Sequence, residues 1–255
     1  MGRADAGLAG SGVNAAVVVA APAKLTLSLR VMGVRSDGYH LIDAEMVSLE
    51  WHDTLTIDPT TAGLTVDGPY AAGVPLDESN LVAAALRHVG RTAGVHIHKA
   101  LPHGGGLGGG SADAAAVLRW AGYDDVAGAA TLSSDVAFCL VGGRARVRGI
   151  GELVEVLPFE SHDLTLVVPP ISAATPAVYR MWDALGGVRT DGPNDLEPAA
   201  LAVYPALATC RDRIREAAGR SPILAGSGAT WFLHGHHDLA GALPDCNVVH
   251  TAACR

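Results

Sequence analysis

Lysine is the residue type that this sequence most conspicuously lacks. Sixteen of its 18 basic residues are arginine, and only Lys24 and Lys99 are lysine. Lysine carries a compact ammonium group whose pKa responds to its surroundings, whereas arginine carries a planar guanidinium group that stays charged. Because the chain uses arginine almost everywhere else, we expect both lysines to have functional roles.

Other absences narrow the class of protein. The formal net charge is -8 and no basic cluster offsets it, which argues against a nucleic-acid partner. No apolar stretch is long enough to cross a bilayer, so no membrane partner is expected. The four cysteines lie far apart without a C-x-x-C pair. We therefore expect free thiols in a reducing, cytoplasmic setting rather than disulfides or a zinc site.

Glycine, by contrast, is concentrated in one place. Residues 101–113 read Leu-Pro-His-Gly-Gly-Gly-Leu-Gly-Gly-Gly-Ser-Ala-Asp, between a predicted strand over 94–101 and a predicted helix from Ser111 to about Ala121. Glycine lets backbone N–H groups face a ligand with no Cβ in the way. A helix N-terminus adds unpaired N–H groups and a partial positive charge. The run therefore predicts a site for a polyphosphate.

Two general interpretations of the glycine run stay open on spacing alone. Gly104, Gly106 and Gly109 fit the G-x-G-x-x-G pattern of dinucleotide-binding folds, with a strand before them and Asp135 about 24 residues on. A flexible linker is the other interpretation, although a linker is not normally fixed between a strand and a helix. The P-loop pattern does not fit, because no Lys-Ser or Lys-Thr follows the glycines.

Several polar residues elsewhere have both a structural and a functional interpretation. Alternation along a predicted strand at 21–29 puts Lys24, Thr26 and Ser28 on one face. A turn at Asp37-Gly38 presents an aromatic and an imidazole side by side, which either hold a nucleobase or cap the core. Asp135, before an apolar run, is either a helix N-cap or a catalytic carboxylate.

Helical and strand patterns alternate in two halves, with antiparallel hairpin signals rather than repeating parallel units, which predicts an α+β fold. Pro158 and the polar residues after it mark the expected boundary between a domain of residues 1–157 and one of residues 158–255. Residues 1–13 are rich in Gly, Ala and Ser and are expected to be disordered. Residues 15–23 imitate a short signal peptide but serve equally well as a strand.

Together these motifs resemble those of the GHMP small-molecule kinases, and within them the diphosphocytidyl methylerythritol kinase family. The resemblance covers about residues 21–235, and its most distinctive part is Asp-Gly-Tyr-His at 37–40. The sequence departs from the family's motifs at Thr26, Ser133 and Ala137, where the family usually has asparagine, glycine and proline. The segment between Ser111 and Asp135 also looks several residues shorter than usual.

The resemblance implies the two-domain GHMP fold, with an N-terminal nucleotide-binding domain, a ferredoxin-like C-terminal domain and the site between them. It implies ATP-dependent phosphorylation of the 2-hydroxyl of diphosphocytidyl methylerythritol, in the synthesis of isoprenoid precursors by the non-mevalonate route. ATP and Mg²⁺ are the implied cofactors, a cytidine diphosphate alcohol the small-molecule partner, and a monomer or homodimer the implied state. Two alternatives remain: a GHMP kinase for another small alcohol, homoserine- or mevalonate-like, and a non-catalytic nucleotide sensor.

The resemblance also implies residue roles. The expected catalytic pair is Lys24 and Asp135, with Asp135 accepting the hydroxyl proton. The residues expected to contact ATP and its phosphates are Asn80, Lys99, Pro102, Gly104, Gly105, Gly106, Leu107, Gly108, Gly109, Gly110 and Ser111. The residues expected to contact the alcohol substrate are Thr26, Tyr39, His40, Tyr179, Gly226, Ser227 and Gly228. Tyr39 and Tyr179 would stack on cytosine, and His40 would read its edge.

Overall fold

A computed structural model describes residues 15–255, so the expected disorder over 1–13 lies outside the described residues. The strands are β1 (Val17–Val34), β2 (His40–Asp58), β3 (Gly63–Asp67), β4 (Gly94–His98), β5 (Arg144–Gly149), β6 (Leu153–Val156), β7 (Asp163–Val168), β8 (Ile223–Leu224), β9 (Trp231–His234) and β10 (Asn247–Cys254). The helices are α1 (Leu81–His88), α2 (Gly109–Trp120), α3 (Val126–Ala130), α4 (Ser134–Val141), α5 (Thr175–Ala184), α6 (Glu197–Val203) and α7 (Ala206–Ala218).

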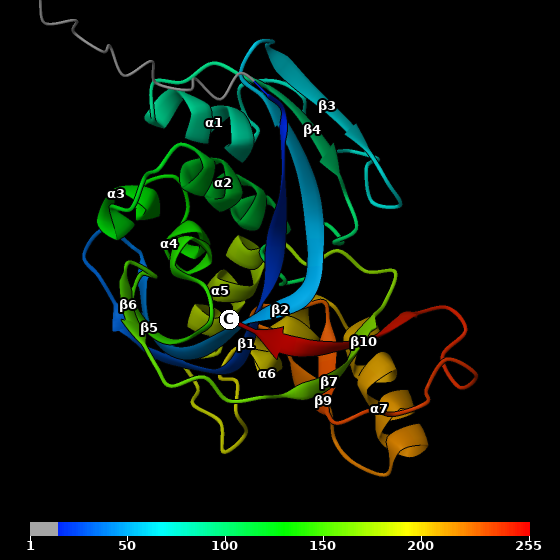
Figure 1. The fold of residues 1–255 in the computed structure, drawn as a ribbon. Coiled ribbons are helices and arrows are strands. Elements are labelled where there is room, and N and C mark those ends of the chain that lie inside the picture. The colour runs from blue at the N-terminus through cyan, green and yellow to red at the C-terminus, as the bar shows by residue number, and fades with distance from the viewer. Residues whose placement is uncertain (1–14) are drawn as a thin grey trace, which may run out of the picture.

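The long antiparallel pair β1–β2 is the frame of the molecule (Figure 1). A turn at 35–39 joins the two strands, as the Asp-Gly signal predicted, and β2 also pairs with β4, β5 and the end of β10. Helices α1, α2 and α4 lie on one side of this pair, with α2 against β1 (Figure 1). Residues 17–34 form a strand, so the strand interpretation of this stretch is confirmed.

The sheet order excludes a dinucleotide-binding unit. The main path of the sheet runs β3-β4-β2-β10-β7-β9-β8, with β1 and β5 also paired to β2 and β6 paired to β5; among the strands of residues 15–255, every pairing except β3–β4 is antiparallel. A dinucleotide-binding β-α-β unit needs the strand after the helix to lie beside the first strand as its parallel neighbour. Here α2 is followed by α3, α4 and then β5, which pairs with β2 and β6 and not with β4. The α+β prediction is confirmed.

The last strand ties the two halves of the chain together. Residues 247–252 of β10 pair with β7, and Ala253 and Cys254 then pair with Leu49 and Ser48 of β2. The connection between β6 and β7 falls at the expected domain boundary, but hydrogen bonds cross it, and the division at 157/158 stays a prediction.

A bulge in β1 changes which side chains face the site. The pairing of β1 with β2 shifts register between Pro22 and Lys24 and again between Thr26 and Ser28. A bulge re-aims the side chains that follow it. Lys24, Thr26 and Leu29 therefore line one cavity, and Ser28 does not. The simple alternation predicted for this strand is wrong after Thr26.

The glycine run is anchored by one leucine before it and by a second in its middle. Leu101 and Leu107 are fully buried in a cluster with side chains from β1, β2, β7 and β9. Burying a leucine side chain is worth about 1.5–3 kcal/mol. An anchored segment of this kind is not a flexible linker, so that interpretation of the run is wrong.

Candidate active site

Two glycine turns pack backbone against backbone at the centre of the site. The carbonyl of Gly104 accepts a hydrogen bond from the N–H of Ala229 at 3.3 Å, and that of Gly105 accepts one from Thr230 at 3.2 Å. The first glycine loop therefore rests on residues 225–230, the second glycine turn of the sequence. The close approach explains why both turns are rich in glycine.

Gly106 is the position where this approach is tightest. Its φ of +76° lies in the left-handed region, and a Cβ there would lie 2.9 Å from the carbonyl oxygen of Gly228 and closer still to that of Ala225. No larger residue fits without moving backbone. Gly228 thus lies behind the loop and supports it, and it is not among the residues that line the cavity described below.

Helix α2 begins directly at the end of the loop. Gly108, with φ +66°, is its N-cap residue, and the helix starts at Gly109, two residues before the predicted start. The N–H groups of Gly109, Gly110 and Ser111 therefore lack a carbonyl partner within the helix. Together with the helix dipole they form an anion site.

Lys24 and Asp135 form an ion pair beside the loop. The Lys24 Nζ lies 3.3 Å from Oδ2 of Asp135 and donates to Oγ1 of Thr26, also at 3.3 Å. The backbone N–H of Lys24 donates to the carbonyl of Leu107 at 3.0 Å, and a Cβ at Gly108 would lie 2.7 Å from Cγ of Lys24. The lysine is therefore held against the loop by its backbone and by its aliphatic stem.

Asp135 is not the N-cap of its helix. Ser133 takes that position, and Asp135 lies in the first turn of α4 with its side chain 31% exposed. The carboxylate is therefore available to the cavity. The N-cap interpretation of Asp135 is wrong, and its catalytic interpretation stays a prediction.

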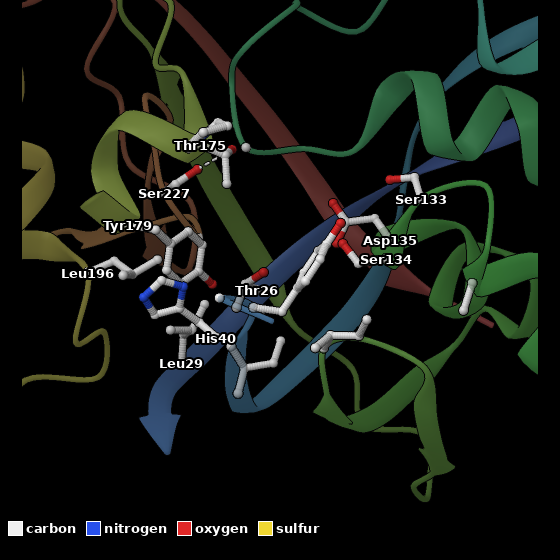
Figure 2. Close-up of a pocket in the computed structure, with 18 of the residues that line it drawn as sticks. Thr26, Leu29, His40, Ser133, Ser134, Asp135, Thr175, Tyr179, Leu196 and Ser227 are labelled. Carbon is white, nitrogen blue, oxygen red and sulfur yellow. Dashed lines mark hydrogen bonds between the residues drawn. The ribbon is translucent and has the colours of Figure 1, made fainter. Parts of the chain in front are cut away.

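A cavity of about 850 Å³ opens in front of this ion pair. Figure 2 shows His40, Tyr179 and Leu196 on one side of it and Ser133, Ser134 and Asp135 on the other, with Thr26 between them. The predicted residues that line this cavity are Lys24, Thr26, Tyr39, His40, Gly106, Asp135, Tyr179, Gly226 and Ser227.

The aromatic end of the cavity is built around His40. Its ring lies against Tyr179, with ring centroids 4.6 Å apart, and its Nε2 lies 2.8 Å from Oδ1 of Asp183. Burial, with a smaller contribution from the charge of Asp135, raises the pKa of Tyr179, so its hydroxyl stays protonated. Tyr39 is 60% exposed at the rim. The three predicted rings thus line one cavity, and His40 rather than Tyr39 lies against Tyr179.

The remaining predicted nucleotide contacts lie outside this cavity. Asn80 is the N-cap of α1: its Oδ1 accepts from Val82 N–H at 2.8 Å and its Nδ2 donates to the Pro75 carbonyl at 2.7 Å. The side chains of Pro102 and Leu107 are buried, so only their backbone is available to a ligand. Their nucleotide contacts stay predictions.

The position of Lys99 does not fit the predicted contact of its side chain with ATP. Its side chain is 2% exposed, and its Nζ contacts Asp53 Oδ2 and lies 2.7 Å from Asp113 Oδ2. The ammonium lies beneath the glycine loop, between two carboxylates, and does not reach the ligand side. Burial opposes its charge, but the two carboxylates outweigh this effect and raise the pKa of Lys99.

Asp113 is the most perturbed carboxyl group of the site. Burial raises its pKa to about 7, and the neighbouring Asp53 adds to the increase while Lys99 opposes it. Cys139 of α4 also faces this region, and burial raises its thiol pKa to about 12, so it is neutral. A carboxyl group with a raised pKa in the folded state stabilises the fold at low pH, and this contribution is lost as pH rises toward 7.

We therefore expect Asp113→Asn to have a melting temperature that rises relative to wild type as pH increases from 5 to 8. The asparagine keeps the shape of the side chain and cannot ionise, so only the wild-type protein loses the contribution of Asp113 over this range. Melting curves of both proteins across that pH range test this. A difference that stays constant with pH would show that Asp113 does not titrate there.

Several residues of the site were not identified by any motif in the sequence. Asp53 and Asp183 lie outside every quoted motif, and Asp113 was quoted only as part of the glycine run. The scarcity of lysine was the available clue, because a buried lysine requires an acidic partner. For Asp183, its place one helical turn after Tyr179 was the only hint.

Further features concern metals, thiols and membranes. Within residues 15–255, no group of three or more His, Cys, Asp or Glu side chains is arranged to hold a metal ion. The four cysteines are free. None of the helices in that range has the length and apolar character needed to cross a bilayer.

Comparison with known proteins identifies the family. Residues 80–143 match the family model described as GHMP kinases N terminal domain. The chain is 39% identical over 232 residues to a 4-diphosphocytidyl-2-C-methyl-D-erythritol kinase of Paracoccus denitrificans, covering 84% of this chain and 85% of that protein. It is 40% identical over 244 residues to the protein of that name from Dinoroseobacter shibae, covering 83% of each.

Solved structures agree with this result. The crystal structure of a 4-(cytidine 5'-diphospho)-2C-methyl-D-erythritol kinase matches with a TM-score of 0.74 and 30% identity, covering 94% of this chain and 100% of that one. Mevalonate kinase from Methanococcus jannaschii matches with a TM-score of 0.61 at 12% identity, over 95% of this chain and 100% of that chain, which shows a shared fold only. The chain belongs to the 4-diphosphocytidyl-2-C-methyl-D-erythritol kinase family of the GHMP kinases.

Proposed function

We propose that this protein transfers the γ-phosphoryl group of ATP to the 2-hydroxyl of 4-diphosphocytidyl-2-C-methyl-D-erythritol, as its relatives' names indicate. The Lys24–Asp135 ion pair is the observation that carries the proposal, because it lies between the glycine loop and the cavity. Phosphoryl transfer depends on positioning and charge neutralisation more than on covalent chemistry. A fixed cation, a carboxylate and a row of backbone amides supply those requirements.

In the proposed reaction the substrate hydroxyl oxygen forms a bond to the γ-phosphorus of ATP, and the bond from that phosphorus to the bridging oxygen of ADP breaks. Asp135 takes the proton that the hydroxyl loses. Lys24 holds the hydroxyl and Asp135 in place through its ion pair. The loop amides and the N–H groups at the start of α2 hold the phosphates.

The residues present fit ATP, because the start of α2 at Gly109 and Gly110 leaves backbone N–H groups without a partner in the helix, and such groups bind phosphate. A magnesium ion would be held by the ATP phosphates with the hydroxyl of Ser111 near them, since Mg²⁺ commonly binds through phosphates and few protein ligands. When bound, it would neutralise the phosphate charge. Ser111 is buried in the first turn of α2, and its Oγ lies 3.5 Å from Oγ of Ser133.

The cytidine would occupy the aromatic end of the cavity. The aromatic rings there, of Tyr39, His40 and Tyr179, supply π-faces, and the imidazole of His40 also supplies ring nitrogens. The exposed Tyr39 is free to move onto a base. Gly226 and Ser227 line the same cavity, and the Ser227 hydroxyl is 2.8 Å from that of Thr175. A cytoplasmic location and a monomeric or homodimeric state stay predictions.

The direct test is ADP release by the purified protein with Mg-ATP, measured with and without diphosphocytidyl methylerythritol. Homoserine and mevalonate are the matched control alcohols. Substrate-dependent ADP release with the cytidine compound alone is the expected result. Release with either control instead would favour the other-alcohol alternative, and ATP binding without turnover on any alcohol would favour the sensor.

Tyr39→Ala tests the cytidine end of the cavity. Stacking of an aromatic side chain on a base is worth about 1–3 kcal/mol, so the KM for the cytidine substrate is expected to rise roughly 5- to 150-fold. The KM for ATP is the internal control and is expected to change little, because backbone groups of the glycine loop hold the phosphates and the substitution does not alter them. An unchanged KM for the cytidine substrate would contradict the assignment of Tyr39.

A further inference from the structure

Lys99 and its two aspartates join three elements beneath the glycine loop. Asp53 comes from β2, Lys99 directly follows β4, and Asp113 lies in the second turn of α2. All three are almost fully buried, with exposed fractions of 0%, 2% and 3%. A buried charged group is costly unless it is paired and hydrogen-bonded. A contact with the nucleotide does not explain why these three charged side chains are buried together.

The cluster fixes the start of the loop. Oδ1 of Asp53 accepts hydrogen bonds from the backbone N–H groups of Ala100 at 2.6 Å and Leu101 at 2.8 Å, and its Oδ2 contacts the Lys99 ammonium. These are the last two residues before the Pro-His-Gly turn that opens the loop. One carboxylate thus holds the backbone at the loop's entry, while the lysine balances its charge.

The same ammonium also fixes the end of the loop. Lys99 Nζ donates to Oδ2 of Asp113 on α2 at 2.7 Å. A Cβ placed on Gly109, the first residue of that helix, would lie 3.3 Å from Lys99 Nζ and 3.4 Å from Oδ2 of Asp53. The cluster therefore lies directly under the helix start, whose free N–H groups form the anion site.

We propose that Lys99 is a positioning residue that fastens both ends of the glycine loop, through Asp53 at its entry and Asp113 at its exit, and holds the phosphate-binding amides in place before ATP arrives. A glycine-rich loop loses more conformational freedom on ordering than any other sequence. Ordering it in advance removes that cost from binding. This inference rests on the proposed function only in taking ATP phosphates as the ligand of the loop.

The charges of the cluster show which residue to change. It holds one cation and two carboxyl groups, and Oδ1 of Asp113 is buried without a hydrogen-bond partner among the described residues. Removing Asp113 leaves Lys99 paired with Asp53, which is a balanced pair with its backbone hydrogen bonds intact. Removing Lys99 would instead leave two buried carboxylates side by side, and such a variant risks unfolding.

The test compares Asp113→Ala with Asp113→Asn. Alanine removes the acceptor in a helix that already has alanine on both sides of this position, whereas asparagine keeps an oxygen that accepts from Lys99. We expect Asp113→Ala to weaken the Kd for Mg-ATP, measured by calorimetry without the alcohol, by about tenfold, as for residues that orient a binding shell. Asp113→Asn should stay within about twofold of wild type.

Hydrogen exchange supplies a readout that does not depend on ATP. In the protein without nucleotide, peptides spanning residues 101–109 should exchange faster in Asp113→Ala than in wild type or Asp113→Asn. Peptides of β7 and β9 are the control and should be unchanged. If wild type bound no Mg-ATP, the proposed function would fail, yet the exchange experiment would still decide on the fastening of the loop.

Two outcomes would overturn the proposal. One is an Asp113→Ala protein whose loop exchange and ATP affinity both equal those of wild type. The other is unfolding of both Asp113→Ala and the volume-filling Asp113→Leu while Asp113→Asn folds, which would assign the contact to global stability. Faster loop exchange together with weaker ATP binding, in a folded Asp113→Ala or Asp113→Leu, would support it.

Discussion

Asp135→Asn is expected to lower kcat by about 10²- to 10⁴-fold, the usual contribution of a positioned general base. Asparagine keeps the shape of the side chain and cannot accept the hydroxyl proton. Because Asp135 faces the cavity from the first turn of α4 and does not cap that helix, its replacement removes no helix cap. The KM for ATP is expected to change little, since the phosphates are held by backbone amides of the loop.

Steady-state kinetics at saturating ATP measures this effect, with Asp124→Asn as the matched control. Asp124 is an exposed carboxylate between α2 and α3 and does not line the cavity, so its change has the same effect on net charge without touching the site. Asp124→Asn should keep wild-type kcat. If Asp135→Asn turned over within tenfold of wild type, Asp135 would not be the base.

Local patterns predicted the parts of this site that local physics controls. The glycine run leads into α2, and the Asp-Gly turn joins β1 to β2, because each feature depends on a few neighbouring residues. The α+β class followed from the hairpin signals. These features can be predicted without knowing which residues pack against them.

The features that the sequence did not predict depend on distant partners. Whether Lys99 faces the ligand or the core was decided by Asp53, 46 residues away, and the orientation of His40 by Asp183, 143 residues away. The bulge after Thr26 replaced Ser28 by Leu29 in the cavity wall, because a single shift of register exchanges the faces of a strand. Such features can be predicted only when the positions of distant residues in the folded chain are known.

Lys24→Met is the second change expected to have a large effect, a loss of about 10²- to 10³-fold in kcat. Without its cation the Asp135 carboxylate is no longer held in position, so most of the contribution of the positioned base is lost. Methionine keeps an unbranched apolar stem against Gly108, so the packing beside the loop should survive and the melting temperature should stay near that of wild type. Lys24→Arg restores the charge without the shape, and we expect it to remain impaired.

The double variant Lys24→Met/Asp135→Asn decides whether the two residues act as a unit. Their side chains are 3.3 Å apart, and residues in direct contact give effects that do not add. Once the carboxylate is gone, Lys24 has no base to hold, so the double variant should be little slower than Asp135→Asn alone. A loss equal to the product of the two single losses would mean that Lys24 acts on the phosphates independently of Asp135. In that case the loop and Lys24, rather than the ion pair, would be the centre of the catalytic machinery.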